Sequence, residues 1–256
     1  MDLRGYIMRR FAVGLHMVNH AQHFDLAFIS VNRLRERRSH FVVGDWIMDS
    51  GAFTTIAKHG DYPHPVSEYA AQIRRWKDCG NLLSAVSQDY MCEAHMLART
   101  GLTVADHQRL TIERYDALLA EDTGVYLMPV LQGYAPQDYV AHLAAYGDRL
   151  AHGAWVGVGS VCKRNGDPRA IESVLLAIKT ERPDLKLHGF GLKGTALGSG
   201  LVCELLETAD SMAWSFAARK ARHHGDRSRS GNDYREAQRW VDSMLNRPRQ
   251  AVWSFL

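Results

Sequence analysis

The chain has 256 residues, of which 46% are hydrophobic and 23% are charged. This is the ordinary balance of a soluble globular protein, and the length suits one large α/β domain. No stretch approaches the roughly 18 consecutive apolar residues of a membrane span, and no apolar segment of a secretory signal follows the basic N-terminus. We therefore expect a cytoplasmic protein without a membrane partner.

Four cysteines are scattered along the chain without any CxxC or CxC pair. This spacing argues against a structural zinc site, and free thiols suit a reducing compartment. The formal net charge of +3 is too small to identify a nucleic-acid partner by itself.

Short apolar runs alternate along the chain with longer amphipathic stretches. We predict strands at residues 11–15, 26–31, 46–49, 83–88, 126–131, 155–158, 185–188 and 211–216. We predict helices at residues 67–79, 104–119, 136–146, 168–180 and 194–208. This alternation is typical of βαβ units with a parallel sheet, and eight strands favour closure. The predicted fold is α/β, a single (β/α)8 TIM-type barrel domain over residues 1–256, with a closing helix at 233–245 that Arg247 and Pro248 end.

Polar or glycine-containing clusters stand at the carboxyl ends of five predicted strands. They are DSGAF at 49–53, QDY at 88–90, LQGY at 131–134, GVGS at 157–160 and HGFG at 188–191. Active sites of (β/α) barrels are built on this rim, and buried polar groups there are costly unless they are used or paired. The clusters therefore predict a pocket at the rim.

Three aspartates belong to this predicted rim. Asp49 ends the predicted strand 46–49, Asp89 follows the predicted strand 83–88, and Asp210 directly precedes the predicted strand 211–216. Together they could supply the nucleophile and the acid–base group that glycosidic-bond chemistry requires. Each aspartate alone could equally cap a helix or pair with an arginine.

Other rim residues suit a flat, polar ligand. The glycines of 157–160 and 189–191 would let the backbone approach it closely, although glycine is also common in βα loops. Gln132 offers an amide donor and acceptor for a purine edge. Tyr90 and Phe53 could stack on a base, and core packing explains them as well.

Histidines and basic residues leave two further possibilities open. His16, His20 and His23 have a helix-like spacing that can bind zinc, but no carboxylate or cysteine partner is close in sequence. Residues 219–229 form a basic segment, which is either a solvated charged loop or a grip for phosphates. Its cationic residues are Arg219, Lys220, Arg222, Arg227 and Arg229, and Lys163, Arg164 and Lys193 follow rim motifs and could join them.

The order of these motifs resembles the tRNA-guanine transglycosylase superfamily from about residue 49 to residue 219. DSGAF resembles that family's DSGGFQ, VLQG at 130–133 its VQGG, HGFG its MGVG, and DSMAW at 210–214 the DSASY of its archaeal branch. Residues 157–161 match its glycine-rich strand end, and Asp89 falls where the family has an aspartate that reads the purine edge. None of these motifs alone identifies the superfamily, but their occurrence in the same order is specific for it.

The resemblance implies a pentosyltransferase that exchanges guanine for a 7-deazaguanine through a covalent aspartyl–sugar intermediate. Asp210 would be the nucleophile and Asp49 its acid–base partner. The base would be bound by Asp89, Gln132, Gly159, Ser160, Val161, His188, Ser50 and Phe53. His188 would take the place of a methionine that packs on the base. Alternatively, His188 could be a core residue whose ring nitrogens are hydrogen-bonded within the protein.

Departures from the superfamily pattern indicate a branch. The tRNA enzymes hold zinc with a C-terminal CxCxxC and a later histidine, whereas no cysteine follows Cys203 here. The chain is also far shorter than those enzymes. DSGAF with Ala52, the run GVGSVCKR and HGFGLK look more like the DpdA-type 7-deazaguanine DNA transglycosylases of bacteria and phages.

The DpdA-type resemblance implies DNA as the polymer, a preQ0-like incoming base, and neither metal nor cofactor. The target nucleotide would have to flip out of the duplex, and a helper protein for strand opening and a homodimer are compatible with the sequence. The alternatives are a tRNA-guanine transglycosylase, a small-molecule barrel enzyme such as a nucleoside hydrolase, and a non-catalytic binding subunit.

Overall fold

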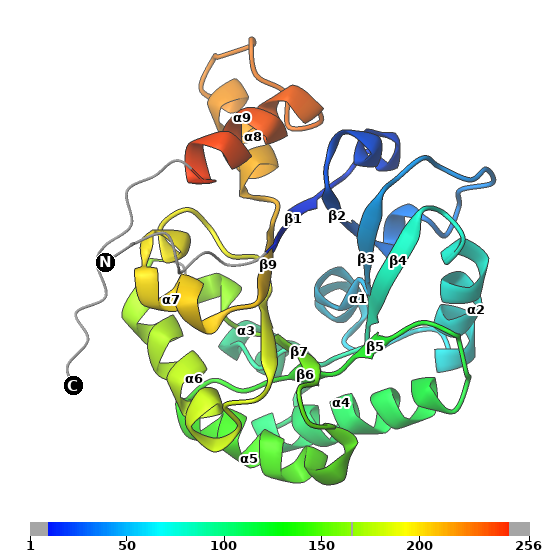
Figure 1. The fold of residues 1–256 in the computed structure, drawn as a ribbon, viewed down its shortest axis with the longest axis vertical. Helices are drawn as coiled ribbons and strands as arrows, with labels where there is room; N and C mark the ends of the chain where they lie inside the picture. Colours follow the sequence, from blue (N-terminus) through cyan, green and yellow to red (C-terminus); the bar gives the residue numbers. More distant parts are fainter. Residues whose placement is uncertain (1–9, 165, 246–256) are drawn as a thin grey trace.

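The computed structural model describes residues 10–164 and 166–245, and a sheet of parallel strands curls into a barrel with helices around it (Figure 1). The strands are hydrogen-bonded in the order β5-β4-β3-β2-β1-β9-β8-β7-β6. Their bounds are β1 Arg10–Gly14, β2 Leu26–Ser30, β3 Asp45–Asp49, β4 Asn81–Val86, β5 Leu127–Met128, β6 Val130–Leu131, β7 Trp155–Val158, β8 Lys186–Gly189 and β9 Thr208–Ser211. All of their pairings are parallel, so the carboxyl ends of the strands share one rim.

The barrel is nearly closed at a broken strand. β5 pairs with β4 while β6 pairs with β7, and only Pro129 separates the two segments. Proline has no backbone N–H to donate to a ladder, so the pairing is interrupted there. The predicted strand 126–131 therefore becomes two strands, and the sheet formed by the described residues has nine strands where the sequence predicted eight.

Most helices lie outside the sheet, between successive strands, whereas α1 lies within the ring of strands in this view (Figure 1). Their bounds are α1 Ala52–His59, α2 Val66–Trp76, α3 Ala94–Thr100, α4 Val104–Leu119, α5 Pro136–Tyr146, α6 Pro168–Glu181, α7 Gly200–Leu205, α8 Ala213–His223 and α9 Tyr234–Leu245. α4 and α5 coincide with their predicted ranges because local signals fix their starts. Thr103 caps α4 in a capping box with Asp106, and α5 begins with Pro136.

Two predicted elements were wrong. The last strand of the barrel is β9, Thr208–Ser211, and the predicted strand 211–216 runs instead into helix α8. A short apolar run does not distinguish a strand from a buried helical turn, and Trp214 and Ala218 are buried at helical spacing. Asp210 therefore lies within its strand rather than before it.

The predicted helix 194–208 also breaks up. Only a short 3₁₀ turn at Ala196–Gly198 and α7 are helical there, and the range ends inside β9. Gly194, Gly198 and Gly200 lower the helix propensity of this stretch. Helices α1 and α3 were not predicted, because each is short and begins within a rim motif or a few residues after one.

Apolar side chains form a plug inside the barrel and a larger layer between strands and helices. The interior plug consists of Ala12, Leu26, Phe28, Ile47, Val86, Met128 and Val130, with Leu83, Trp155 and Phe190 packed against it. Side chains alternate along a strand, so a residue two positions after an inward-facing one also faces inward. Asp49 follows Ile47 in this way, and Asp210 pairs with the inward-facing Ala12. Both carboxylates thus belong to the interior face, at the rim.

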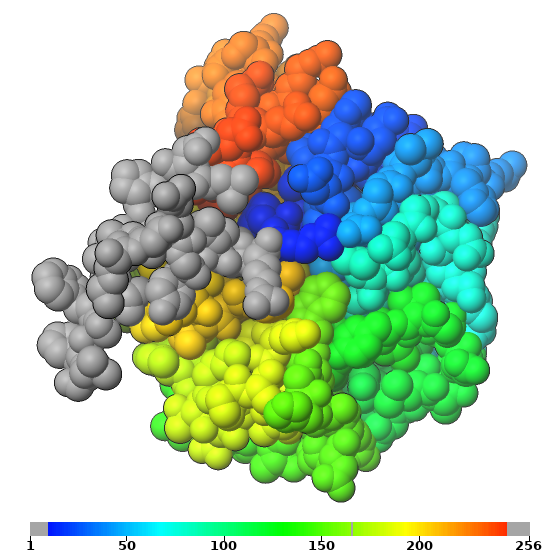
Figure 2. Space-filling model, viewed as in Figure 1, coloured from blue at the N-terminus to red at the C-terminus, as the bar shows by residue number. Residues whose placement is uncertain are grey.

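Helices α8 and α9 project from the barrel beside its first strands, as the orange and red segment of Figure 2 shows. Tyr234 of α9 stacks on His23 with ring centroids 3.9 Å apart, and Trp240 contacts Phe11. α9 falls within the range predicted for a closing helix, while Arg247 and Pro248 lie outside the described residues. In the part of the chain that the structure describes, the helices are too short or too polar to cross a membrane.

A matched pair of glycines tests the turn that leads into β4. Gly80 and Gly101 both have positive φ, but a Cβ on Gly80 would lie 2.3 Å from the Val43 carbonyl oxygen, whereas Gly101 has open space. We expect Gly101→Ala to lower the free energy of unfolding by about 1–2 kcal/mol for its backbone conformation. Gly80→Ala should cost about 3 kcal/mol or more, because overpacking is added to that strain. Urea unfolding measures both, and equal losses would contradict the close approach.

Candidate active site

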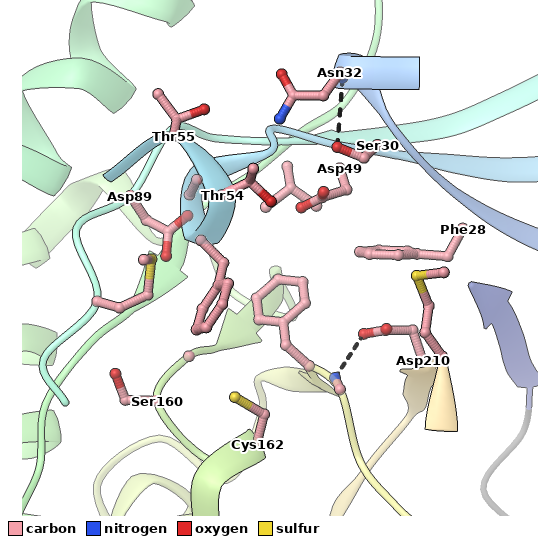
Figure 3. Close-up of a pocket in the computed structure, with 18 of the residues that line it drawn as sticks. Phe28, Ser30, Asn32, Asp49, Thr54, Thr55, Asp89, Ser160, Cys162 and Asp210 are labelled. Carbon is pink, nitrogen blue, oxygen red and sulfur yellow. Dashed lines mark hydrogen bonds between the residues drawn. The ribbon is translucent and has the colours of Figure 1, made fainter. Parts of the chain in front are cut away.

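The carboxyl ends of the strands open into a cavity of about 690 Å³. This is a typical volume for a site that binds a small molecule or a single nucleotide. Residues predicted from the sequence make up much of its lining: Asp49, Phe53, Asp89, Gln132, Gly159, Ser160, Lys163, Lys193 and Asp210. Figure 3 shows Asp49, Asp89 and Asp210 approaching this space from different elements, with the ring of Phe28 beside Asp210.

Asp49 is the last residue of β3 and lies where the chain turns into α1. Gly51 makes this turn at a φ of +73°, and a Cβ there would lie 2.3 Å from the amide nitrogen of Asn32. Burial raises the pKa of Asp49 to about 6, a hydrogen bond from Ser30 opposes this rise, and the charge of Asp210 adds to it. Asp49 therefore has the environment of a proton carrier near neutral pH.

Asp210 is buried in β9, and two nitrogen atoms lie within hydrogen-bonding distance of one of its carboxylate oxygens. The Gly191 N–H lies 3.0 Å from Asp210 Oδ1, and His188 Nε2 lies 3.3 Å from the same oxygen. N–H donors stabilise a carboxylate anion, so this arrangement suits a side chain that reacts in its ionised form.

Asp89 lies in the loop after β4 and belongs to a hydrogen-bonded network. Gln132 donates its amide N–H to Asp89 and accepts at Oε1 from Ser160 Oγ at 2.7 Å. Burial raises the pKa of Asp89 to about 7, the Gln132 hydrogen bond opposes this rise, and the charges of Asp49 and Glu93 add to it. The network holds a carboxylate that can accept hydrogen bonds from a ligand's N–H groups.

Ser160 is held by its side chain in the left-handed region, at a φ of +55°. Its Oγ accepts from the Cys92 N–H at 2.8 Å and lies 3.1 Å from Glu93 Oε2. A non-glycine residue in this conformation costs of order 1–3 kcal/mol and persists only where its surroundings impose it. These contacts provide that constraint at the cavity wall.

Sequence reasoning missed Glu93, which is buried and lines the cavity. It is the residue before α3, and an acid there is ordinarily interpreted as part of a helix N-terminus. Its carboxylate instead faces Ser160 and lies 3.7 Å from the sulfur of Cys162. Only its position four residues after Asp89 could have suggested a second acid at this wall.

The glycines of the predicted Gly-rich strand end leave room for protein side chains. A Cβ on Gly159 would lie 2.1 Å from the Gln132 amide nitrogen, and a Cβ on Gly157 would lie 2.4 Å from the ring of Phe190. Gly159 also lines the cavity. These glycines therefore let Gln132 and Phe190 take up their positions.

Four predicted base contacts are not among the residues that line the cavity. Ser50, Val161 and His188 are buried behind it, and Tyr90 is buried with its hydroxyl on Asp61. The ring of His188 stacks on Phe28, with centroids 5.6 Å apart and planes 17° apart.

The cavity mouth carries aromatic and cationic side chains. Phe53 is 43% exposed there, and the Lys163 ammonium lies 5.0 Å from its ring centroid. Arg33 and Lys58 also line the cavity and were not predicted, since no motif marks them. Lys193 lines it as well, while Arg164 stacks on Tyr134 with its guanidinium 4.5 Å from the ring centroid.

The basic segment 219–229 divides into two structural parts. Arg219, Lys220 and Arg222 are exposed on the last turns of α8, and Arg227 is exposed in the following loop. Arg229 differs, because it pairs with the buried Glu236 of α9 at 3.0 Å. The charge of Arg219 also reaches His16, whose pKa is lowered to about 4 by burial, by Arg33 and by Arg219. The segment therefore begins close to the cavity.

The three histidines that suggested zinc have other partners. His16 lies 2.9 Å from Arg33, and His20 and His23 pack on Tyr234. Within residues 10–164 and 166–245, no group of three or more histidine, cysteine or acidic side chains is arranged to hold a metal ion.

The charge state of Asp89 should affect stability. Because its pKa is raised in the folded protein, the native state binds more protons than the unfolded state between about pH 4 and pH 7, and stability falls as the pH rises through that window. Asp89→Asn should therefore match the wild type near pH 4 and exceed it at pH 8 by about 1.4 kcal/mol or more, the equivalent of one pKa unit.

Urea unfolding of both proteins across this pH range measures the difference. Asp116→Asn is the control, because Asp116 forms an exposed ion pair with Arg149. Such pairs contribute about 0–1 kcal/mol, and their loss is not expected to stabilise the protein. A wild type more stable than Asp89→Asn at pH 8 would contradict the buried environment of Asp89.

A comparison with protein families matches residues 11–253 to the model described as DpdA, DeoxyPurine in DNA protein A. A comparison with the curated proteins found no match. The family match spans the strands, the cavity and the basic segment, and its description indicates an enzyme that modifies purines in DNA. The motif order, the rim carboxylates and this match agree, and the chain belongs to the DpdA family.

Proposed function

We propose that this protein exchanges a guanine in DNA for a 7-deazaguanine through a covalent aspartyl–sugar intermediate. The observation that carries the proposal is that two carboxylates in different environments face one cavity. Asp210 accepts from the Gly191 N–H and lies 3.3 Å from His188 Nε2, whereas Asp49 has a pKa raised to about 6 by burial. Pairs of acids with environments that differ in this way divide the roles of nucleophile and proton carrier.

In the first step a carboxylate oxygen of Asp210 attacks C1′ of the target deoxyguanosine. A bond forms between that oxygen and C1′, and the bond from C1′ to N9 of guanine breaks. The electron pair of the broken bond leaves with the base, and protonated Asp49 supplies the proton that makes guanine a neutral leaving group.

In the second step the incoming 7-deazaguanine attacks C1′ through N9. The Asp49 carboxylate takes the N9 proton, the new bond to C1′ forms, and the ester oxygen of Asp210 leaves as a carboxylate. Water must be kept out, because hydrolysis of the intermediate would leave an abasic site. Phe28 and Phe190 supply apolar walls beside Asp210 for this purpose.

The base would be read at the wall opposite the nucleophile. The Asp89 carboxylate can accept from the N1–H and N2–H donors of a guanine-like base, and Gln132 and Ser160 hold it in place. The backbone at Gly159 lies at the same wall. Ser50, Val161 and His188 would support the lining residues from behind.

DNA would approach the cavity mouth with the target nucleotide flipped out of the helix. Phe53 and Lys163 stand at that mouth, and Arg219 begins a row of exposed cations on α8. Lysine and arginine contacts to phosphates position nucleic acid without reading its sequence.

The reaction is tested by incubating the protein with DNA carrying labelled guanine, and separately with labelled tRNA, in the presence of 7-deazaguanines. We expect label to be released from DNA, and Asp210→Asn to abolish both this release and a protein–DNA adduct that survives denaturation. Asp49→Asn should slow release by about 10²-fold or more, the usual contribution of a positioned acid. Asp116→Asn serves as the surface control. Release from tRNA alone would overturn the choice of polymer, and water-dependent release without incorporation would favour a hydrolase.

The pH dependence of the first step follows from Asp49 and Asp89. Because this step uses protonated Asp49 and ionised Asp89, single-turnover release should change little between pH 6 and pH 7 and fall about tenfold per pH unit above pH 7. The residual activity of Asp49→Asn should lack this fall. An unchanged pH profile in Asp49→Asn would assign the proton to another group.

Neutralising Arg219, Arg222 and Arg227 to glutamine should weaken DNA binding and flatten its salt dependence, by a slope of about one per lost phosphate contact. Arg229 is left intact, because it pairs with Glu236. Arg75, Lys77 and Lys186 form the charge-matched control, since they lie where α2 ends and β8 begins, at the opposite end of the barrel. Equal salt slopes for the two triple variants would refute the role of the basic segment.

A further inference from the structure

We infer that His188 is a positioning residue that orients the Asp210 carboxylate, and that a hydrogen-bond chain from Trp155 sets the direction of its proton. The inference rests on the proposed function, because it treats Asp210 as the reacting carboxylate. It assigns His188 a place beneath the nucleophile instead of a contact with the base.

The hydrogen-bond chain links the neighbouring strands β7, β8 and β9. Trp155 Nε1 of β7 lies 3.0 Å from Thr208 Oγ1 of β9, which lies 2.8 Å from His188 Nδ1 of β8. His188 Nε2 lies 3.3 Å from Asp210 Oδ1. The register of the sheet brings these groups together, because His188 is directly opposite Thr208 and Asp210 faces inward two residues later.

The donors and acceptors of this chain can be ordered. An indole N–H only donates, so Thr208 Oγ1 accepts from Trp155 and its own hydroxyl proton is left to donate. Among the described residues, the acceptor in reach of that hydroxyl is His188 Nδ1. Nδ1 is then unprotonated, and the ring proton is on Nε2, where it points at Asp210. The other neutral tautomer would instead place the Nε2 lone pair against a carboxylate.

The ring of His188 is held on its faces as well as at its edges. It is fully buried, stacks on Phe28, and meets Phe190 edge-on with centroids 4.8 Å apart. Packing of this kind keeps a ring in one rotamer, which is what a positioning group requires.

The two donors to Asp210 in the described part of the chain, Gly191 N–H and His188 Nε2–H, both reach Oδ1. Fixing one oxygen of a carboxylate fixes the direction of the other. Oδ2 is thereby left to form the bond to C1′, while Oδ1 keeps its donors through the reaction. These donors also stabilise the carboxylate when it leaves in the second step.

Matched variants test the chain by single-turnover kinetics of adduct formation. His188→Met removes the donor at similar volume and should slow the step about 10–100-fold, as a misplaced reacting group does, with the KM for DNA nearly unchanged. His188→Gln keeps an amide N–H and should recover part of the rate. Thr208→Val should slow the step less, because Nε2 is then no longer forced to carry the proton. Thr123→Val replaces another buried threonine, one whose hydroxyl has no partner among the described groups, and should match the wild type.

A second measurement does not depend on activity. Nitrogen NMR of histidine-labelled protein, with the His188 signals identified by their loss in His188→Met, should show a neutral ring protonated at Nε2. A ring protonated at Nδ1, or wild-type kinetics in both His188→Met and Thr208→Val, would overturn the inference. An inactive wild type would instead count against the proposed function, and the tautomer would still decide whether the chain reaches Asp210.

Discussion

Asp89 and Asp210 are buried and Asp49 is partly buried, and the free-energy cost of removing these carboxylates from water determines what surrounds them. A buried carboxylate is unstable unless N–H or O–H donors reach it. Ser30 and the Gly51 backbone serve Asp49, while Gly191 and His188 serve Asp210. The loops and strand ends around the cavity therefore supply these donors. At Asp49 the hydrogen bonds do not fully offset the effect of burial, so its pKa stays raised, at about 6.

Beneath the carboxylates lies an apolar floor that makes their geometry rigid. Phe28 and Phe190 top the interior plug of the barrel, and the absence of a side chain at Gly157 makes room for the Phe190 ring. Gly159 gives the same room to Gln132, which holds Asp89. Glycine at the ends of these strands thus allows the side chains of the site to pack closely. The close-packed interior in turn keeps the reacting carboxylates in fixed positions.

The cationic residues fall into two groups, those with structural partners and those exposed to solvent. Arg229 is bound to the buried Glu236, and the guanidinium of Arg164 stacks on Tyr134, so both contribute to holding loops and helices in place. Arg222 and Arg227 are exposed, at the last turn of α8 and in the loop after it. A basic cluster in a sequence therefore mixes structural ion pairs with groups that remain exposed to a polyanion, and only the neighbours of each residue distinguish them.

The sequence by itself determined the alternation of strands and helices, the bounds of α4 and α5, the rim positions of Asp49 and Asp89, and the family, because these depend on local periodicity, capping and motif order. It did not determine the split of one strand at Pro129 or the helical state of residues 213–216, where tertiary packing overrode an ambiguous apolar run. Nor did it indicate Glu93 as a wall of the cavity. The orientation of His188 was decided only by the folded barrel, because its partners come from strands distant in sequence that the sheet register brings within hydrogen-bonding distance.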